Sequence, residues 1–185
     1  MATKGQILVD RQSGDQFEFI ETSSDTNGKR LTIKTTLKSN GALVPDHLHM
    51  LQDEEFEIIS GKLTVITEGR QLGVKAGEKI LLHKNKAHNH YNGGDTPVVY
   101  IQTVTPALDL EHFFETYVGL SNDGKVKDGK AGIIQELVIL KYLDSKAYMA
   151  GMPIGVQNIL MNIIAPVARK AGYRAVYKKY SGIEK

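Results

Sequence analysis

Residues 41–61 read GALVPDHLHMLQDEEFEIISG, and a later segment that begins at His88 reads HNHYN. His47 and His49 are separated by one residue, so on an extended strand both imidazoles project from the same face. Glu54 follows after four intervening residues. Three imidazoles and one carboxylate suit divalent iron, manganese, nickel or zinc. A lone histidine pair in a polar loop is usually just solvated, but the carboxylate, the strand and the later histidine together indicate a metal site.

The spacing of these residues resembles the two sequence motifs of the cupin superfamily. The first cupin motif runs Gly, five residues, His-x-His, three or four residues, Glu, six residues and Gly. Every fixed position of this motif is present in the chain, as Gly41, His47, His49, Glu54 and Gly61. The resemblance implies that one divalent transition metal is held inside a barrel by His47, His49, Glu54 and His88.

The second cupin motif is matched with two departures. It runs Gly, five residues, Pro-x-Gly, two residues, His, three residues and Asn. Gly77, His88 and Asn92 match it, whereas His83 stands at the proline position and Asn85 at the second glycine position. Asparagine tolerates a left-handed backbone better than most residues, so the turn can form at Asn85. The missing proline leaves the metal ligands untouched.

The resemblance implies an all-β (mainly β) fold, a double-stranded β-helix or jelly-roll barrel, and the side-chain pattern supports it. Residues 30–37 alternate between apolar and polar side chains, as a half-buried strand does. Residues 98–104 form a continuous apolar run typical of a buried strand. Short strands of this kind, separated by turn residues, predict a small sandwich or barrel.

Alternation along the strand after Gln52 distinguishes two adjacent carboxylates. Glu54 shares one face of this strand with Phe56 and Ile58, while Glu55 lies on the other face. The apolar face should point into the barrel, so we expect Glu54 to point inward and Glu55 to meet water.

Two more residues of the later segment are candidates for contact with a substrate. His90 and Asn92 share a strand face with His88. His90 is a candidate fifth ligand, a group that holds substrate or water beside the metal, or a polar residue that lines the barrel mouth.

The pattern changes from strand to helix after Pro106. Asp109 is a candidate N-terminal cap, and Gly119 is expected to end the first helix. Between them the apolar residues Leu110, Phe113, Phe114 and Tyr117 recur at helical spacing.

The chain is therefore predicted to consist of a barrel, residues 1–106, and a C-terminal α-helical appendage, residues 107–185. Further helices are expected at residues 133–143 and between Pro153 and Gly172. Several side chains of the appendage are too apolar to stay exposed, so we expect them to pack on the barrel or in a homodimer. These side chains are Phe113, Phe114, Leu137, Leu140 and Ile163.

The composition describes an ordinary globular chain of 185 residues with 24% charged residues and a net charge of +2. This balance favours no nucleic-acid partner. The chain has no cysteine, which excludes disulfides and thiolate ligands. No apolar run approaches the roughly 18–20 residues of a spanning helix, and the start does not resemble a signal peptide, so a cytoplasmic location is expected. A membrane-surface helix is a weaker alternative, because Arg169 and Lys170 follow the last apolar stripe.

Two classes of function fit the predicted site. The first is a metal-dependent enzyme, of dioxygenase or isomerase type, that acts on a small oxygen-bearing substrate. The second is a barrel that binds metal and a small molecule without turnover. The complete ligand set favours the enzyme, although no further nucleophile or base stands out in the sequence.

Overall fold

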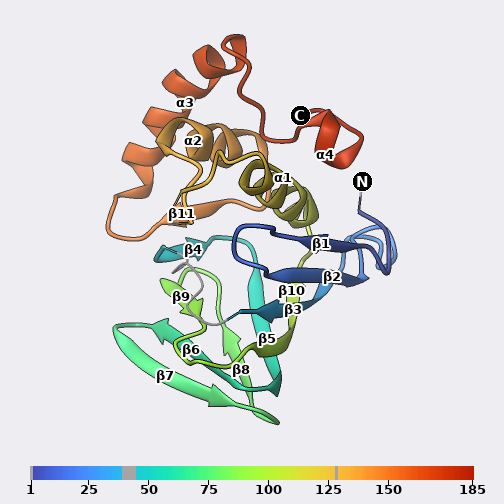
Figure 1. The fold of residues 1–185 in the computed structure, drawn as a ribbon. Helices are drawn as coiled ribbons and strands as arrows, with labels where there is room; N and C mark the ends of the chain where they lie inside the picture. Colours follow the sequence, from blue (N-terminus) through green and yellow to red (C-terminus); the bar gives the residue numbers. More distant parts are fainter. Residues whose placement is uncertain (1, 39–44, 128) are drawn as a thin grey trace.

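The computed structural model describes residues 2–38, 45–127 and 129–185. In these residues the strands form two antiparallel sheets, and the helices gather at one end of the barrel (Figure 1). The strands are β1 (Ile7–Val9), β2 (Gln16–Glu21), β3 (Leu31–Leu37), β4 (His47–His49), β5 (Asp53–Ser60), β6 (Lys62–Thr67), β7 (Arg70–Lys75), β8 (Lys79–Leu82), β9 (His88–Tyr91), β10 (Val98–Thr105) and β11 (Ala147–Met149). The helices are α1 (Leu110–Asn122), α2 (Ile133–Tyr142), α3 (Ile154–Lys170) and α4 (Lys178–Ser181).

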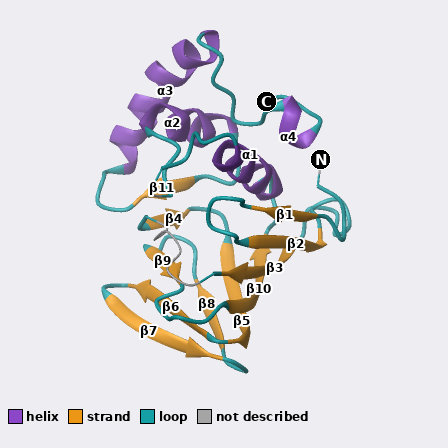
Figure 2. Ribbon diagram, in the orientation of Figure 1, coloured by secondary structure: helices purple, strands orange, loops and turns teal. Residues whose placement is uncertain are grey.

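The two sheets have the strand orders β1-β2-β3-β10-β5-β8 and β11-β4-β9-β6-β7. Strands distant in sequence are neighbours in both sheets, for example β3 beside β10 and β4 beside β9, as in a jelly roll. The predicted mainly-β barrel followed by helices is confirmed. Figure 2 shows one exception to the separation of strands and helices, since the short strand β11 lies on the helical side of the barrel.

A hydrophobic core fills the lower half of the barrel between the two sheets. Strand β5 contributes Phe56 and Ile58, which are fully buried, and each such side chain contributes about 1.5–3 kcal/mol. The remaining buried members are Leu63, Val65, Val74, Leu82, Val98 and Tyr100. This packing sets the register of β5 and therefore decides which of its carboxylates points inward.

The helices cover the outer surface of the barrel through two further apolar clusters. Helix α1 packs against the first sheet, where Phe114 meets Phe17 at a ring-centroid distance of 5.4 Å. Helices α2 and α3 pack against Leu48 of β4 and Tyr148 of β11. Strand β11 is hydrogen-bonded to β4 in antiparallel register, with Ala147 opposite His49. The region after residue 106 therefore adds a strand to a barrel sheet.

Helix α1 begins where the sequence predicts but ends later. The helix does not end at Gly119 but continues to Asn122. Gly119 is needed for another reason, because a Cβ atom there would overlap the ring of Tyr180. Asp109 occupies the expected N-cap position, but its side chain makes no cap bond. Its carboxylate instead accepts hydrogen bonds from the backbone N–H groups of Asp144 and Ser145, which fixes the segment that leads into β11.

The predicted apolar side chains of α2 and α3 differ in their burial within the chain. Leu137 and Leu140 of α2 are buried as expected, but Ile163 of α3 is 65% exposed. Helix α3 turns the opposite face inward, with Gln157, Met161, Ala165 and Ala168 buried. The small alanine side chains allow α3 to approach α2 closely, so the larger residues are left outside.

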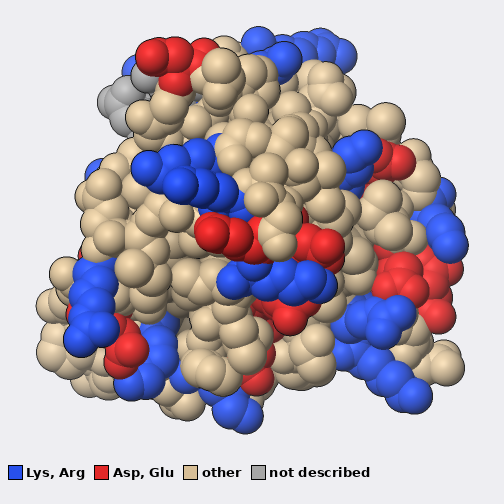
Figure 3. All heavy atoms as spheres, turned by 90° about the horizontal axis from the view of Figure 1, so that it is seen from below, with Lys and Arg blue, Asp and Glu red and all other residues tan. Residues whose placement is uncertain are grey.

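Charged side chains are mixed on the face shown in Figure 3, where Lys and Arg alternate with Asp and Glu. Lys79, for example, lies 2.9 Å from Glu57 and 3.7 Å from Glu55. No basic patch of the kind that binds nucleic acid is seen on this face. Among the described residues, no helix combines the length and the hydropathy needed to cross a bilayer.

Candidate metal centre

The four predicted metal ligands lie together in the upper half of the barrel, above the apolar core. Strand β4 supplies His47 and His49 on one face, and His47 lies opposite His88 of the neighbouring strand β9. Glu54 approaches from β5 in the facing sheet. His49, Glu54 and His88 are each no more than 3% exposed, and His47 is half-buried.

The donor atoms of this group fit one metal ion. Each of the four residues offers one ligand atom, and these atoms all lie within 4.8 Å of one another. Metal–nitrogen bonds of about 2.1 Å place opposite ligands about 4.2 Å apart, so small side-chain movements are enough to close the site. The donor set of three imidazoles and a carboxylate suits a divalent transition metal.

All three histidines are oriented by a hydrogen bond between Nδ1 and a backbone carbonyl group. The Nδ1 atom of His47 lies 2.9 Å from the carbonyl oxygen of Pro45, that of His49 lies 3.2 Å from Lys146 O, and that of His88 lies 2.9 Å from Lys86 O. A carbonyl oxygen only accepts, so each Nδ1 must carry the proton. Each Nε2 is then free to offer its lone pair to a metal, as outer hydrogen bonds ensure in metal sites.

Glu54 is also held in place by a neighbour. Its Oε2 lies 3.1 Å from Nε2 of His88, and its Oε1 lies 3.7 Å from Nε2 of His49. The amide of Gln102 on β10 donates to Oε1 at 3.0 Å, and both side chains are buried. Sequence reasoning missed Gln102. Gln102 could have been found from its position, because it is the one amide among the alternate residues of 98–104 that point into the barrel.

The predicted difference between the two glutamates is confirmed in their orientation. Glu54 is buried, whereas the side chain of Glu55 is 45% exposed and lies 3.7 Å from Lys79. Asp53, the other carboxylate close in sequence, accepts a backbone hydrogen bond from Lys84 on the outside of the barrel.

Burial and mutual attraction set the protonation of the metal-free cluster. Burial alone would raise the pKa of Glu54, but the imidazoles of His49 and His88 outweigh it and hold that pKa well below its usual range. Burial, helped by repulsion from His49, lowers the pKa of His47 to about 3. Burial would lower the pKa of His88 too, but the hydrogen bond and the charge of Glu54 raise it above 6.5. His88 therefore holds the proton that neutralises Glu54 when no metal is present.

Metal uptake is expected to release this proton. Near pH 6, below the raised pKa of His88, about one proton should leave for each metal bound, and affinity should weaken about tenfold per pH unit as the pH falls. Titration calorimetry in buffers of different ionisation enthalpy measures the released protons. His83→Asn is the matched control, because His83 is 65% exposed and should not alter the count. Binding without proton release at this pH would contradict the proposed charge state.

His90 and Asn92 differ in the structure. His90 lies inside the barrel, with its ring 4.8 Å from that of Phe56 and its Nε2 3.2 Å from the hydroxyl of Tyr100. Its Nδ1 is buried and has no hydrogen-bond partner among the described residues. Asn92 is buried, but its amide is occupied, since Nδ2 donates to the carbonyl of Thr96 and Oδ1 accepts from the N–H of Gly94.

The turn residues of the two motifs show why their types are required. Gly61 has a φ of 80°, and a Cβ atom there would lie 2.7 Å from the carbonyl oxygen of Pro97. Asn85, at the second glycine position, adopts a φ of 64°, so the expected left-handed turn is confirmed. Gly41, the first residue of the first motif, lies outside the described residues.

Comparison with known proteins gives one family match. Residues 34–104 match the family model described as "Cupin domain". This range includes the four candidate ligands and ends at β10, before the helices. No curated protein matches the chain.

Several solved structures are similar in fold. KdgF from Halomonas sp. is 14% identical, with a TM-score of 0.49 over 57% of this chain and 90% of that chain. A predicted oxalate decarboxylase from Thermotoga maritima is 17% identical, with a TM-score of 0.48 over 57% of this chain and 99% of that chain. A sugar phosphate isomerase of the cupin superfamily from Silicibacter pomeroyi is 19% identical, with a TM-score of 0.44 over 50% of this chain and 59% of that chain.

Proposed function

We propose that this chain, which contains a cupin-like domain, binds one divalent transition metal and uses it to act on a small oxygen-bearing substrate. The metal would be iron, manganese, nickel or zinc, and its ligands would be His47, His49, Glu54 and His88.

One observation supports this proposal most directly. The three histidines each donate an Nδ1 proton to a backbone carbonyl group, although those groups come from three different segments of the chain. This arrangement turns three Nε2 atoms toward one buried carboxylate. In metal sites the outer hydrogen bond of each histidine decides which ring nitrogen faces the metal, and here it selects Nε2 in all three rings.

The surrounding residues suit chemistry on a small molecule. When bound, the metal would polarise an oxygen of the substrate, and four protein ligands leave two positions of a six-coordinate ion for substrate and water or dioxygen. His90 would contact the substrate through its free ring nitrogen. The rings of Phe56 and Tyr100 stand next to His90 and exclude bulk water from this side. A reaction of dioxygenase or isomerase type fits these features.

Metal analysis combined with turnover measurements tests the proposal. Protein purified without chelators is expected to contain about one metal ion per chain and to consume oxygen, or to isomerise the substrate, with part of a panel of enolic and phenolic compounds. His90→Phe should reduce turnover and leave the metal content unchanged. Metal without turnover would favour a binding barrel, and protein that takes up no metal would reject the proposed function.

The homodimer stays a prediction, and the exposed face of α3 supports it. Val156, Ile159, Ile163 and Val167 are between 44% and 67% exposed and recur at spacings of three, four and four residues. This spacing forms a continuous seam along one side of a helix. A second copy offers the same seam, so two α3 helices related by a two-fold axis would cover each other. The cytoplasmic location also stays a prediction.

Ile163→Glu is expected to convert a dimer into a monomer, because it places a charge in the middle of the seam. Light scattering after size-exclusion chromatography measures the mass. Leu81→Glu is the control, since Leu81 is 48% exposed on β8, away from α3. A wild-type chain that is monomeric at all concentrations, or equal masses for the two variants, would refute the α3 interface.

A further inference from the structure

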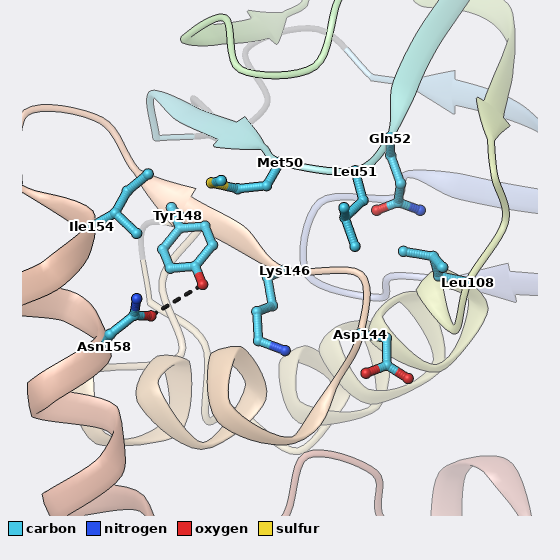
Figure 4. A pocket seen from close by; sticks show the side chains of 9 residues that line it. All are labelled: Met50, Leu51, Gln52, Leu108, Asp144, Lys146, Tyr148, Ile154 and Asn158. Carbon is cyan, nitrogen blue, oxygen red and sulfur yellow. Dashed lines mark hydrogen bonds between the residues drawn. The ribbon is translucent and has the colours of Figure 1, made fainter.

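A cavity lies outside the barrel, where the helical region covers the end of β4. Its volume is about 410 Å³, within the range of small-molecule sites. One wall is the link from Met50 to Gln52 between β4 and β5, and the other consists of residues from β11 and the start of α3 (Figure 4). None of the four candidate metal ligands lines it, because the lining from this part of the chain begins at Met50, after β4 has ended.

Much of the cavity wall is apolar and open to solvent. Leu51 is 59% exposed and Met50 is 41% exposed, and both stand at the cavity together with Ile154 and the ring of Tyr148. The hydroxyl group of Tyr148 donates to Asn158 at 3.1 Å, and this tyrosine, which is 6% exposed, forms part of the cavity wall (Figure 4). These surfaces suit a small aromatic or aliphatic body.

Gln52 provides an unused hydrogen-bond acceptor at the cavity. The side chain is 1% exposed, and its Nε2 donates to the carbonyl oxygens of Pro106 and Ala107 at 3.0 and 3.1 Å. These two bonds fix the orientation of the amide. Its Oε1 is buried and has no partner in the described part of the chain. In Figure 4 this oxygen lies on the cavity side of the amide. A buried acceptor of this kind calls for a ligand that donates a hydrogen bond.

Lys146 provides a cation on the opposite wall. Its Nζ donates to the carbonyl of Leu143 at 2.8 Å, and no carboxylate of the described residues lies within 4.0 Å of it. The acidic residue at the rim, Asp144, is 72% exposed and faces Lys185 at 3.9 Å. The ammonium group of Lys146 is therefore available to an anionic ligand.

We propose that this cavity binds a small hydroxylated carboxylic acid with an aromatic or aliphatic body. The carboxylate pairs with Lys146, the hydroxyl donates to Oε1 of Gln52, and the body packs between Leu51 and Tyr148. This site is separate from the candidate metal centre and does not depend on it.

Two hydroxy acids, 4-hydroxyphenylacetate and 6-hydroxyhexanoate, serve as probes for the full-length chain. At least one is expected to bind with a dissociation constant below about 1 mM. Phenylacetate, which lacks the hydroxyl, should bind about fivefold more weakly than its hydroxylated counterpart, and tyrosol, which lacks the carboxylate, about tenfold more weakly. Calorimetry gives the affinities, and amide chemical shifts of residues 50–52 and 146–148 locate the ligand. If neither hydroxy acid binds at about 5 mM, the proposal is overturned.

Two variants and one treatment make the test specific. Lys146→Met keeps the backbone of β11 and is expected to weaken binding about tenfold, whereas Lys75→Met on the distant strand β7 should have no effect. Ile154→Trp should block the cavity and abolish binding without removing any charge. Removal of metal with EDTA should leave the affinity unchanged. Equal binding by the Lys146 and Lys75 variants, or loss of binding after EDTA treatment, would show that the ligand does not occupy this cavity.

Discussion

Glu54→Gln is expected to lower metal affinity by more than about 100-fold, while Glu55→Gln leaves it unchanged. Glu54 is the one carboxylate of the candidate ligand set, and it lies among the imidazoles of His49 and His88. An amide at this position removes the negative charge that offsets the metal ion. Glu55 is exposed on the opposite face of β5, so its replacement should change the free energy of unfolding by no more than about 0.5 kcal/mol.

The two glutamine variants should be purified in parallel and analysed for bound metal by mass spectrometry. They are isosteric with the wild-type side chains, so a difference between them reports the charge at each position. Equal metal loss in both variants, or loss in Glu55→Gln alone, would contradict the inward position of Glu54. Full occupancy in both would leave a site of three histidines without a carboxylate.

A chain that ends at residue 106 is expected to aggregate. Removing residues 107–185 would uncover Leu48 and Phe17, which pack against the helices, and would take Leu110 out of the cluster that contains Phe19. Each fully buried aliphatic or aromatic side chain contributes about 1.5–3 kcal/mol, so the combined loss is a large share of the roughly 5–15 kcal/mol stability of a typical domain. The edge of β4 would also lose its hydrogen bonds to β11 and become free to pair with other chains.

Expression of the shortened chain beside the full chain tests this expectation. The soluble fraction, the mass in solution and the thermal midpoint are the quantities to compare. A soluble monomer with the midpoint of the full chain would show that residues 1–106 form an independent domain. The division of the chain at residue 106 stays a prediction until this comparison is made.

The inward carboxylate could be predicted because it follows from the two-residue period of a strand. The barrel was implied by the resemblance to the cupin motifs, and the strand pattern supported it. Phe56 and Ile58 identify the buried face of β5, and Glu54 shares that face. His47 and His49 share a face for the same reason, since they are two residues apart on a strand. These features need no knowledge of which strands are neighbours.

Other features depend on contacts between distant segments and left little signal in the sequence. Strand β11 has three residues and is defined only by its pairing with β4. Gly119 resembled a helix end, but the ring of Tyr180 packs against it from α4. The face of α3 that carries Ile163 was expected to pack on the barrel or in a homodimer, and it does not pack within this chain. Periodicity locates such a face on a helix but does not say what covers it.

The contact between His49 and Lys146 has a consequence for biosynthesis. The carbonyl that orients this imidazole belongs to a residue 97 positions further along the chain. Before residues 147–149 have emerged from the ribosome, β4 lacks its outer neighbour β11. His49 can adopt its final tautomer and direction only after β11 has left the exit tunnel. A metal ion met earlier by the nascent chain would find two oriented imidazoles rather than three, so tight loading is expected only after β11 has paired with β4.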